Sequence, residues 1–181
     1  MDRVFKIVVT GPFDSGKTTF IGSISEIDVV STEKSTRTKS GAKVNTTVAM
    51  DFGRITFDDG YILHLYGTPG QGRFDFMWEI LSEGMLGYVV LVDGSSPETF
   101  EDGKSILESF LRISKVPFVV GMTRGDHRNC ADVEELAARI GLKSGIDVIR
   151  CDARSVSDVK NILISLLEKV EESAEAVERA G

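Results

Sequence analysis

Runs of consecutive apolar residues alternate along this chain with segments in which apolar residues recur every three or four positions. The apolar runs predict buried β-strands over residues 4–10, 85–92, 116–122 and 146–151. The periodic segments predict helices that follow residues 17, 97, 132 and 156. Ser96-Pro97 and Ser155 supply capping residues for two of these helix starts.

Two further segments, 47–57 and 61–66, are rich in β-branched and aromatic residues and flank Asp59-Gly60, a favoured hairpin turn. The order of elements is therefore strand–helix, hairpin, and then strand–helix three times. This order predicts a three-layer α/β fold: a mostly parallel six-stranded sheet with one antiparallel strand and helices on both faces. In such sheets, ligands bind at the carboxyl ends of the strands.

Composition narrows the class of protein. The 181 residues are 41% hydrophobic and 27% charged, which suits one domain over residues 1–181. A formal charge of −7 argues against general nucleic-acid binding. Cys130 and Cys151 lack metal-ligand spacing and favour a reducing, cytoplasmic setting. With no bilayer-length apolar run, signal peptide or lipidation motif, we expect no direct membrane anchor, so that membrane contact would come through a partner.

Residues 11–18 read G-x-x-x-x-G-K-T, the pattern of a phosphate-binding loop, between a predicted strand and a predicted helix. Glycines at both ends let the backbone approach phosphate oxygens, Lys17 reaches the β- and γ-phosphates, and the Thr18 hydroxyl ligates Mg²⁺. The alternative is a chance glycine-rich turn, which the flanking elements disfavour. The nucleotide-binding residues predicted here are Gly11, Asp14, Ser15, Gly16, Lys17, Thr18 and Thr19.

Residues 31–44 form a polar segment without apolar periodicity, which predicts a long loop. Between Lys34 and Lys43 it carries four cations and no acid. The segment is either a solvated loop with scattered charge or a lid in which one cation assists phosphoryl transfer.

Two further strings extend the pattern: T-T-V-A-M-D-F-G at residues 46–53 and G-T-P-G-Q at residues 67–71. With the phosphate loop, they make the chain resemble the Ras/Rab/Arf-like small GTP-binding proteins over nearly its whole length, and most closely a bacterial and archaeal branch of them. The resemblance implies a P-loop NTPase fold, Mg²⁺-dependent hydrolysis of GTP that is slow without an activating partner, and a conformational switch between GDP and GTP states.

The resemblance also implies roles for residues near the γ-phosphate. Thr47 would ligate Mg²⁺ together with Thr18, and Thr46 is the rival candidate; both could instead be ordinary strand residues. Gly70 would contact the γ-phosphate through its N–H. Gln71 would orient the attacking water, unless it is a solvated turn residue. The catalytic residues predicted in this way are Gln71, Lys17 and Thr47.

Thr123-Arg124-Gly125-Asp126 stands where the family has its guanine-binding N-K-x-D string. The Asp126 carboxylate would accept the guanine N1–H and 2-amino groups, which adenine lacks, and Arg124 would stack over the base. Thr123 replaces an amide, which predicts a looser site. Residues 151–154 resemble the family's S-A-K loop, so the Ala153 N–H would meet the guanine O6 with Arg154 beside it; taken alone, the segment is a plain strand-to-helix turn.

One departure concerns the metal. The family has Asp at the position of Gly67, and that Asp supports Mg²⁺. Either Asp51 or Asp14 could compensate, and without compensation we expect nucleotide binding to be coupled only weakly to Mg²⁺.

Phe74, Phe76, Met77 and Trp78 fall in the family's second switch segment. They are either core residues or a surface for activating proteins, exchange proteins or effectors that bind at the switch segments. The main alternative to a switch is a non-hydrolysing guanine-nucleotide-binding scaffold. Another P-loop enzyme, such as a small kinase, would have no use for residues 67–71 or 123–126.

Overall fold

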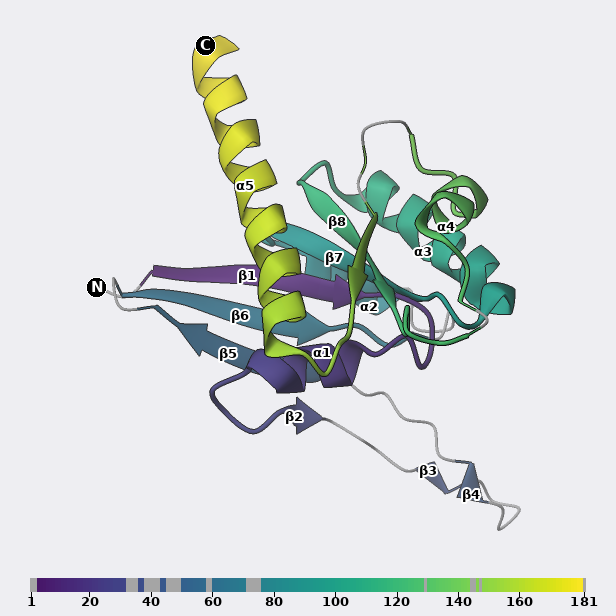
Figure 1. Ribbon diagram of the computed structural model, residues 1–181. Coiled ribbons are helices and arrows are strands. Elements are labelled where there is room, and N and C mark those ends of the chain that lie inside the picture. Colours follow the sequence, from purple (N-terminus) through teal and green to yellow (C-terminus); the bar gives the residue numbers. More distant parts are fainter. Residues whose placement is uncertain are drawn as a thin grey trace.

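The computed structural model describes residues 3–31, 36–37, 43–44, 50–57, 60–70, 76–128, 130–143, 146 and 148–180. A seven-stranded sheet in the order β2-β5-β6-β1-β7-β8-β9 forms the centre of the molecule (Figure 1). Its strands are β1 (Arg3–Thr10), β2 (Val30–Ser31), β5 (Asp51–Thr56), β6 (Tyr61–Gly67), β7 (Gly87–Asp93), β8 (Phe118–Thr123) and β9 (Val148–Cys151).

The predicted fold class is confirmed. The six expected strands are present, and β5 is the one that runs against its neighbours, pairing antiparallel with β6. The pairs β6–β1, β1–β7, β7–β8 and β8–β9 are parallel. The sheet gains a seventh strand that the sequence did not indicate, because two residues of β2 pair with Asp51 and Phe52 at the edge.

Residues 31–44, expected to be a loop, contain two short strands, β3 (Thr36–Arg37) and β4 (Lys43–Val44), which pair antiparallel in a ladder of their own. The cation-rich stretch between Lys34 and Lys43 otherwise lies outside the described residues. The prediction of a lid is therefore not tested here.

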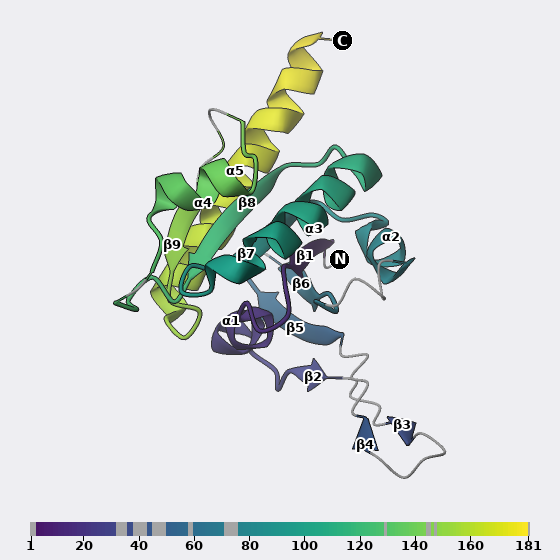
Figure 2. The same cartoon turned by 90° about the vertical axis from the view of Figure 1, so that its right-hand side faces the viewer.

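Helices cover both faces of the sheet (Figure 2). They are α1 (Lys17–Ile24), α2 (Phe76–Ser82), α3 (Phe100–Ile113), α4 (Val133–Arg139) and α5 (Val156–Ala180), with a 3₁₀ turn, η2, at Pro97–Thr99. The helix predicted to begin at Pro97 thus starts as this 3₁₀ turn, and Ser96 makes no side-chain cap. Asp132 does cap α4, accepting a hydrogen bond from the Glu135 N–H at 2.7 Å.

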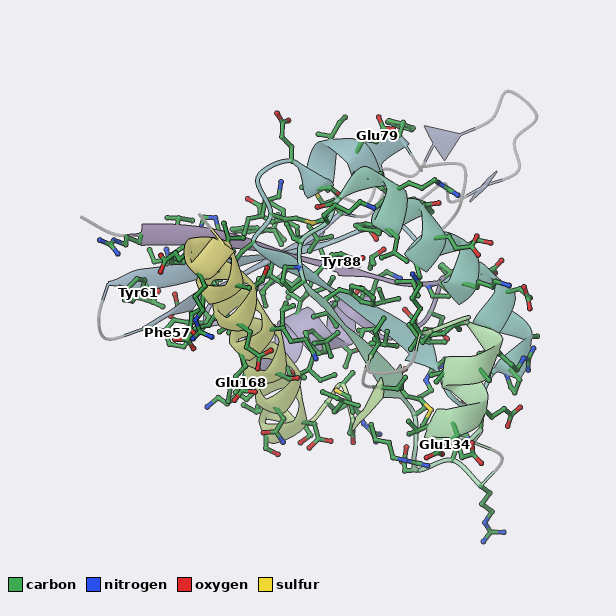
Figure 3. The ribbon with its side chains drawn as sticks, turned by 90° about the horizontal axis from the view of Figure 1, so that it is seen from above. Phe57, Tyr61, Glu79, Tyr88, Glu134 and Glu168 are labelled. Atoms are coloured by element: carbon green, nitrogen blue, oxygen red, sulfur yellow. The ribbon has the colours of Figure 1, made fainter. Side chains whose placement is uncertain are left out.

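Two apolar cores fill the spaces between the layers. Helices α1 and α5 pack on one face through Phe20, Ile21, Ile162 and Leu166. Helices α2, α3 and α4 pack on the other, where Tyr88 is fully buried. Figure 3 views these layers from above, with Tyr88 inside the molecule and Glu134 and Glu168 at its periphery.

Helix α5 is longer than the sheet it covers. Its first half buries Val159, Ile162, Leu163 and Leu166, whereas residues 171–179 are exposed and extend past the sheet (Figure 1). Among the helices in the described ranges, none combines the length and the apolar character needed to cross a membrane.

Candidate nucleotide-binding site

The loop between β1 and α1 has the backbone that its glycines predict. Gly11 and Gly16 have φ values of 143° and 94°, in the region that favours glycine. A Cβ on Gly11 would lie 2.1 Å from the Leu91 carbonyl oxygen, so the loop is pressed against β7 at this point. Asp14 also adopts a positive φ, 59°, at the outer turn of the loop.

Lys17 lies inside this loop. Its ammonium donates to the carbonyl oxygens of Gly11 and Pro12 at 2.9 and 2.6 Å, and approaches the Ser15 hydroxyl at 3.4 Å. Burial lowers the pKa of Lys17 to about 8, although the charges of Asp51 and Asp14 oppose the shift. Lys17 therefore carries its charge at pH 7 in a side chain that is only 9% exposed, the arrangement expected for a group that binds an anion.

Thr18 is the second residue of α1, and its hydroxyl donates to the Asp51 carboxylate with 2.5 Å between Oγ1 and Oδ2. A hydroxyl beside a carboxylate is the hard oxygen pair that Mg²⁺ prefers, and Mg²⁺ usually takes one or two protein ligands together with substrate phosphates. No group of three or more His, Cys, Asp or Glu side chains that could hold a metal ion occurs in the part of the chain that the structure describes. These residues fit a Mg²⁺ ion that is bound jointly with phosphates.

The end of β8 is tied to the phosphate loop. The Thr123 hydroxyl lies 3.0 Å from the Ser15 carbonyl oxygen, to which it donates, and 3.3 Å from that of Val92. Thr123, which stands in place of an amide residue, therefore still joins the end of β8 to the phosphate loop, and the looser nucleotide site stays a prediction.

Arg124 joins three segments of the site. Its guanidinium donates to Asp14 in the phosphate loop at 3.0 Å and forms a second ion pair with Asp93 at the end of β7. Burial would raise the pKa of Asp93, but hydrogen bonds from Ser95 and Arg124 outweigh it and lower that pKa. The Arg124 side chain thus bridges two acids in this structure, whereas the sequence predicted only that it stacks over a base.

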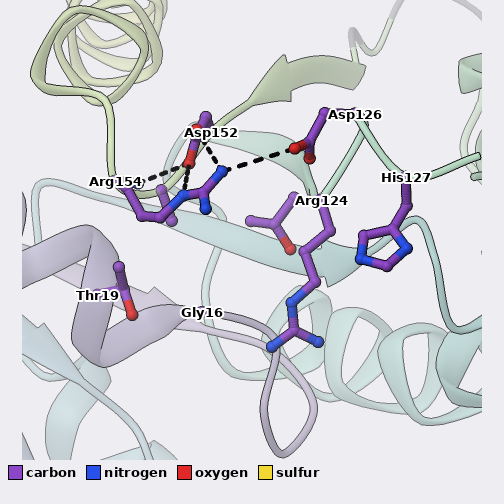
Figure 4. A pocket seen from close by; sticks show the side chains of 9 residues that line it. Gly16, Thr19, Arg124, Asp126, His127, Asp152 and Arg154 are labelled. Carbon is purple, nitrogen blue, oxygen red and sulfur yellow. Dashed lines mark hydrogen bonds and ion pairs between the residues drawn. The ribbon is translucent and has the colours of Figure 1, made fainter.

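A pocket of about 250 Å³ opens beside the first turn of α1 (Figure 4). Its lining residues are Gly16, Thr19, Thr123, Arg124, Asp126, His127, Asp152, Ala153 and Arg154. A Cβ on Gly16 would lie 3.5 Å from the Ala153 Cβ and 3.6 Å from the Thr123 Cγ2. The pocket therefore brings together the phosphate loop and both segments predicted to bind a base.

Arg154 and Asp126 face each other across this pocket. The Arg154 guanidinium lies 3.6 Å from the Asp126 carboxylate and makes a closer pair, 2.9 Å, with Asp152 (Figure 4). Both Asp126 and Arg154 are well exposed, so their contact is screened and weak. The Asp126 carboxylate is thus available to a ligand that enters the pocket.

The loop that carries Ala153 is held by the start of α5. The Ser155 hydroxyl accepts from the Asp158 N–H at 3.3 Å, as the capping spacing predicts, and the Asp158 carboxylate accepts from the Asp152 N–H at 2.9 Å. These bonds fix the backbone on both sides of Ala153, which is what a backbone donor to a ligand requires.

Gly70 and Trp78 connect the other rim of the phosphate loop to α2. A Cβ on Gly70 would lie only 2.5 Å from the Phe13 backbone nitrogen, so this position approaches the loop as closely as a glycine allows. The Trp78 indole N–H donates to the Pro69 carbonyl oxygen at 3.3 Å. Trp78 is buried, as the core interpretation predicts, whereas Phe76 is exposed, and the predicted surface for partners stays untested.

Several predicted residues lie outside the described part of the chain, namely Thr46, Thr47, Gln71 and Phe74. Their predicted roles are therefore untested. Conversely, the pocket includes His127 and Asp152, which sequence reasoning did not select, and the adjoining Asp93 was also missed. Asp93 and Asp152 each directly follow or end a buried strand, a signal that could have drawn attention to them.

Comparison with known proteins places most of the chain in a family. Residues 27–178, most of the chain, match the model of a family described as conserved hypothetical ATP binding protein. The chain belongs to this family. Because the match begins at residue 27, the phosphate loop is an observation independent of it.

Individual relatives agree with this placement. The chain is 36% identical over 121 residues to the uncharacterized protein MJ1339 of Methanocaldococcus jannaschii. The matched region covers 67% of this chain and 70% of that protein. The chain is 30% identical over 144 residues to the mutual gliding-motility protein MglA of Myxococcus xanthus, covering 72% of each. It is 24% identical over 135 residues to the ADP-ribosylation factor-like protein 3 of Saccharomyces cerevisiae, covering 73% of this chain and 65% of the relative.

The description of the family, two of the relatives and the fold support nucleotide binding. The chain is a nucleotide-binding protein of the P-loop type, related to the small GTPases.

Proposed function

We propose that this protein is a small GTP-binding protein that binds GDP and GTP with Mg²⁺, hydrolyses GTP slowly and changes conformation between the two states. The observation that carries the proposal is the pocket in which Asp126 and Ala153 lie beside Gly16 of the phosphate loop. A carboxylate there can accept two guanine donors, N1–H and the 2-amino group. Adenine presents neither donor, so Asp126 favours guanine for a chemical reason.

The chain's own residues supply the binding chemistry. The buried Lys17 ammonium would pair with the phosphates, and the Thr18 hydroxyl with its carboxylate neighbour would hold Mg²⁺. A Mg²⁺ ion in such a site neutralises charge that develops on the phosphates during transfer. Gln71 and Thr47 complete the proposed catalytic set, and Gly70 would donate to the γ-phosphate.

A second candidate is an ATP-binding protein, which the family's description as an ATP binding protein favours. Calorimetric titration with GDP and ADP separates the two. We expect GDP to bind roughly 100-fold more tightly, because two hydrogen bonds to a charged acceptor are worth about 3 kcal/mol or more in total. ADP affinity equal to that of GDP would favour the ATP-binding candidate.

The substitution Asp126→Asn tests the named residue. It should weaken GDP binding by roughly 100-fold and shift preference toward xanthosine diphosphate, whose 2-oxo group suits an amide donor. The matched control is Asp102→Asn on α3, an exposed Asp that is not among the residues lining the pocket. If Asp126→Asn and Asp102→Asn bind GDP equally well, Asp126 does not read the base.

Hydrolysis distinguishes the switch from a non-hydrolysing scaffold. Phosphate release from one equivalent of bound GTP should occur slowly, and Gln71→Leu should slow it further because leucine cannot orient water. Bound GTP that stays intact over many hours would support the scaffold instead.

We also propose that activating proteins, exchange proteins or effectors bind at the switch segments, in a cytoplasmic setting.

A further inference from the structure

Small GTP-binding proteins carry an Asp at the position of Gly67, the last residue of β6 and the first of the string G-T-P-G-Q. The carboxylate of that Asp is therefore missing here. The structure shows what lies beside it. β5 and β6 pair antiparallel with Asp51 directly opposite Gly67, so the two residues project from the same face of the sheet. Asp51 thus stands across the ladder from the missing side chain.

Gly67 makes the room that Asp51 occupies. A Cβ at position 67 would lie 3.0 Å from the Asp51 Cβ, 3.3 Å from its Oδ2 and 3.1 Å from the Ile21 Cδ1. These distances are shorter than ordinary van der Waals contact. A side chain at position 67 would therefore crowd Asp51, and both would fit only if Asp51 or Ile21 shifted by a few tenths of an ångström.

Asp51 lies beside the residues that are predicted to bind Mg²⁺ and phosphate. Asp51 is 4% exposed, its carboxylate accepts from the Thr18 hydroxyl at 2.5 Å, and its charge acts on the buried Lys17 ammonium. Burying a carboxylate is costly unless it is hydrogen-bonded or paired, and here it accepts from the predicted metal-ligating hydroxyl while its charge acts on the predicted phosphate-binding lysine.

We propose that Asp51 supplies the metal-supporting carboxylate of the Mg²⁺–nucleotide site, moved across the β5–β6 ladder from position 67 to position 51. This inference rests on the proposed function, since it assigns a residue to the same site. It replaces the expectation of weak metal coupling: nucleotide retention depends strongly on Mg²⁺, and Asp51 carries that dependence.

The competing carboxylate, Asp14, lies elsewhere. Its side chain is 70% exposed and bound to Arg124 on the outer turn of the phosphate loop. Its carboxylate accepts a hydrogen bond from the Arg124 guanidinium at 3.0 Å, and that cation already neutralises its charge. The geometry therefore favours Asp51 over Asp14 as the compensating group.

The test measures how fast a fluorescent GDP analogue dissociates in excess Mg²⁺ and after chelation with EDTA, for the full chain. Wild type should release the analogue at least tenfold faster after chelation. In Asp51→Asn this ratio should fall toward one, and the Mg²⁺ concentration needed to retain nucleotide should rise about 10- to 100-fold, the usual cost of losing a residue that supports a metal. Asn keeps an oxygen that can accept from Thr18, so the contact with α1 survives in this variant.

A carboxylate swap makes the inference specific. Asp51→Gly should lose the Mg²⁺ dependence, and Asp51→Gly combined with Gly67→Asp should regain it, because the second change places a carboxylate at the opposite position of the same pair. Asp102→Asn is the control for loss of a surface charge, and Asp14→Asn tests the competing carboxylate. Thermal melting without nucleotide checks that each variant is folded.

The outcomes distinguish failure of the role assigned to Asp51 from failure of the proposed function. If Asp51→Asn keeps the wild-type ratio, or if Asp14→Asn loses it, the inference is wrong. Failure of the double variant to regain Mg²⁺ dependence while it remains folded would also count against it. The same measurement runs with a fluorescent ADP analogue, so a preference for adenine would overturn the proposed function without deciding the role of Asp51.

Discussion

At the scale of single residues, the site is organised by charged side chains that bridge separate loops. Arg124 is the clearest case, because its guanidinium joins Asp14 of the phosphate loop to Asp93 of β7. It does so from a left-handed backbone, with φ of 54°, which is unusual for arginine. Such a bridge spans the edge of the pocket and should slow the escape of a bound nucleotide.

Asp14→Asn tests this bridge. Because both partners are partly exposed, the pair is worth no more than about 1 kcal/mol, and we expect nucleotide to dissociate roughly 2- to 5-fold faster. Stopped-flow release of a fluorescent GDP analogue measures the rate, and raised salt should shrink the difference between variant and wild type. An unchanged rate at low salt would show that the bridge does not retain nucleotide.

The two cysteines differ in reactivity for a physical reason. Burial, with the charges of Asp158 and Asp152, raises the pKa of Cys151 to about 12, and burial also raises the pKa of Cys130. A raised pKa lowers the fraction of thiolate, the reactive form, at pH 8. Cys151 is 2% exposed, whereas Cys130 is only partly buried.

We therefore expect iodoacetamide at pH 8 to label Cys130 slowly and Cys151 hardly at all, with both labelled readily in denaturant. Raising the pH toward 9 should speed the labelling of Cys130. Mass spectrometry of the digested protein reports each site. Labelling of Cys151 first in the folded protein would contradict its burial at the end of β9.

At the scale of elements, α5 secures the sheet on the α1 side. Ile162 and Ile164 lie on opposite sides of this helix, fully buried and 52% exposed respectively. They offer a matched pair of substitutions within a single element.

Ile162→Ala should lower the free energy of unfolding by about 2–5 kcal/mol, because it removes buried methyl groups and leaves a cavity. Ile164→Ala should change it by less than about 1 kcal/mol, since its side chain is half in water. Urea unfolding followed by circular dichroism gives both values. Equal effects would mean that α5 does not pack as described.

Elements were also the scale at which sequence reasoning worked best. Every long strand was predicted: β1, β7, β8 and β9 from continuous apolar runs, and β5 and β6 from β-branched and aromatic residues that flank a hairpin turn. Each begins or ends within a few residues of its expected bounds. Helix starts were less certain, as the 3₁₀ turn at Pro97 shows. Local propensity does not distinguish that turn from a first α-helical turn.

Some residues of the site could be predicted from the sequence and others could not. The phosphate loop could be predicted because its chemistry lies in eight consecutive residues. The choice between Asp51 and Asp14 could not be made, because it depends on the pairing of Asp51 with Gly67 and on the distance from β5 to α1. Likewise, nothing local to Arg124 indicated its bond to an acid 110 positions away.

At the scale of the whole molecule, the proposed switch requires two conformations, one with GDP bound and one with GTP bound. Gly70 touches the phosphate loop at Phe13, and its neighbour Pro69 accepts a hydrogen bond from the Trp78 indole. A ligand shifts an equilibrium only through contacts that differ between the states, and a γ-phosphate that engages Gly70 supplies such a contact. Its loss on hydrolysis should therefore be transmitted to α2 through Pro69 and Trp78.

The fluorescence of Trp78, the single tryptophan of the chain, tests the switch most directly. Emission should be recorded with GDP and with a non-hydrolysable GTP analogue, each in excess Mg²⁺, and with the matching adenine nucleotides as controls. The account predicts different emission for the two guanine nucleotides and no response to the adenine pair at the same concentrations. Identical emission with GDP and the GTP analogue, both shown by calorimetry to be bound, would contradict the claim that this protein is a switch.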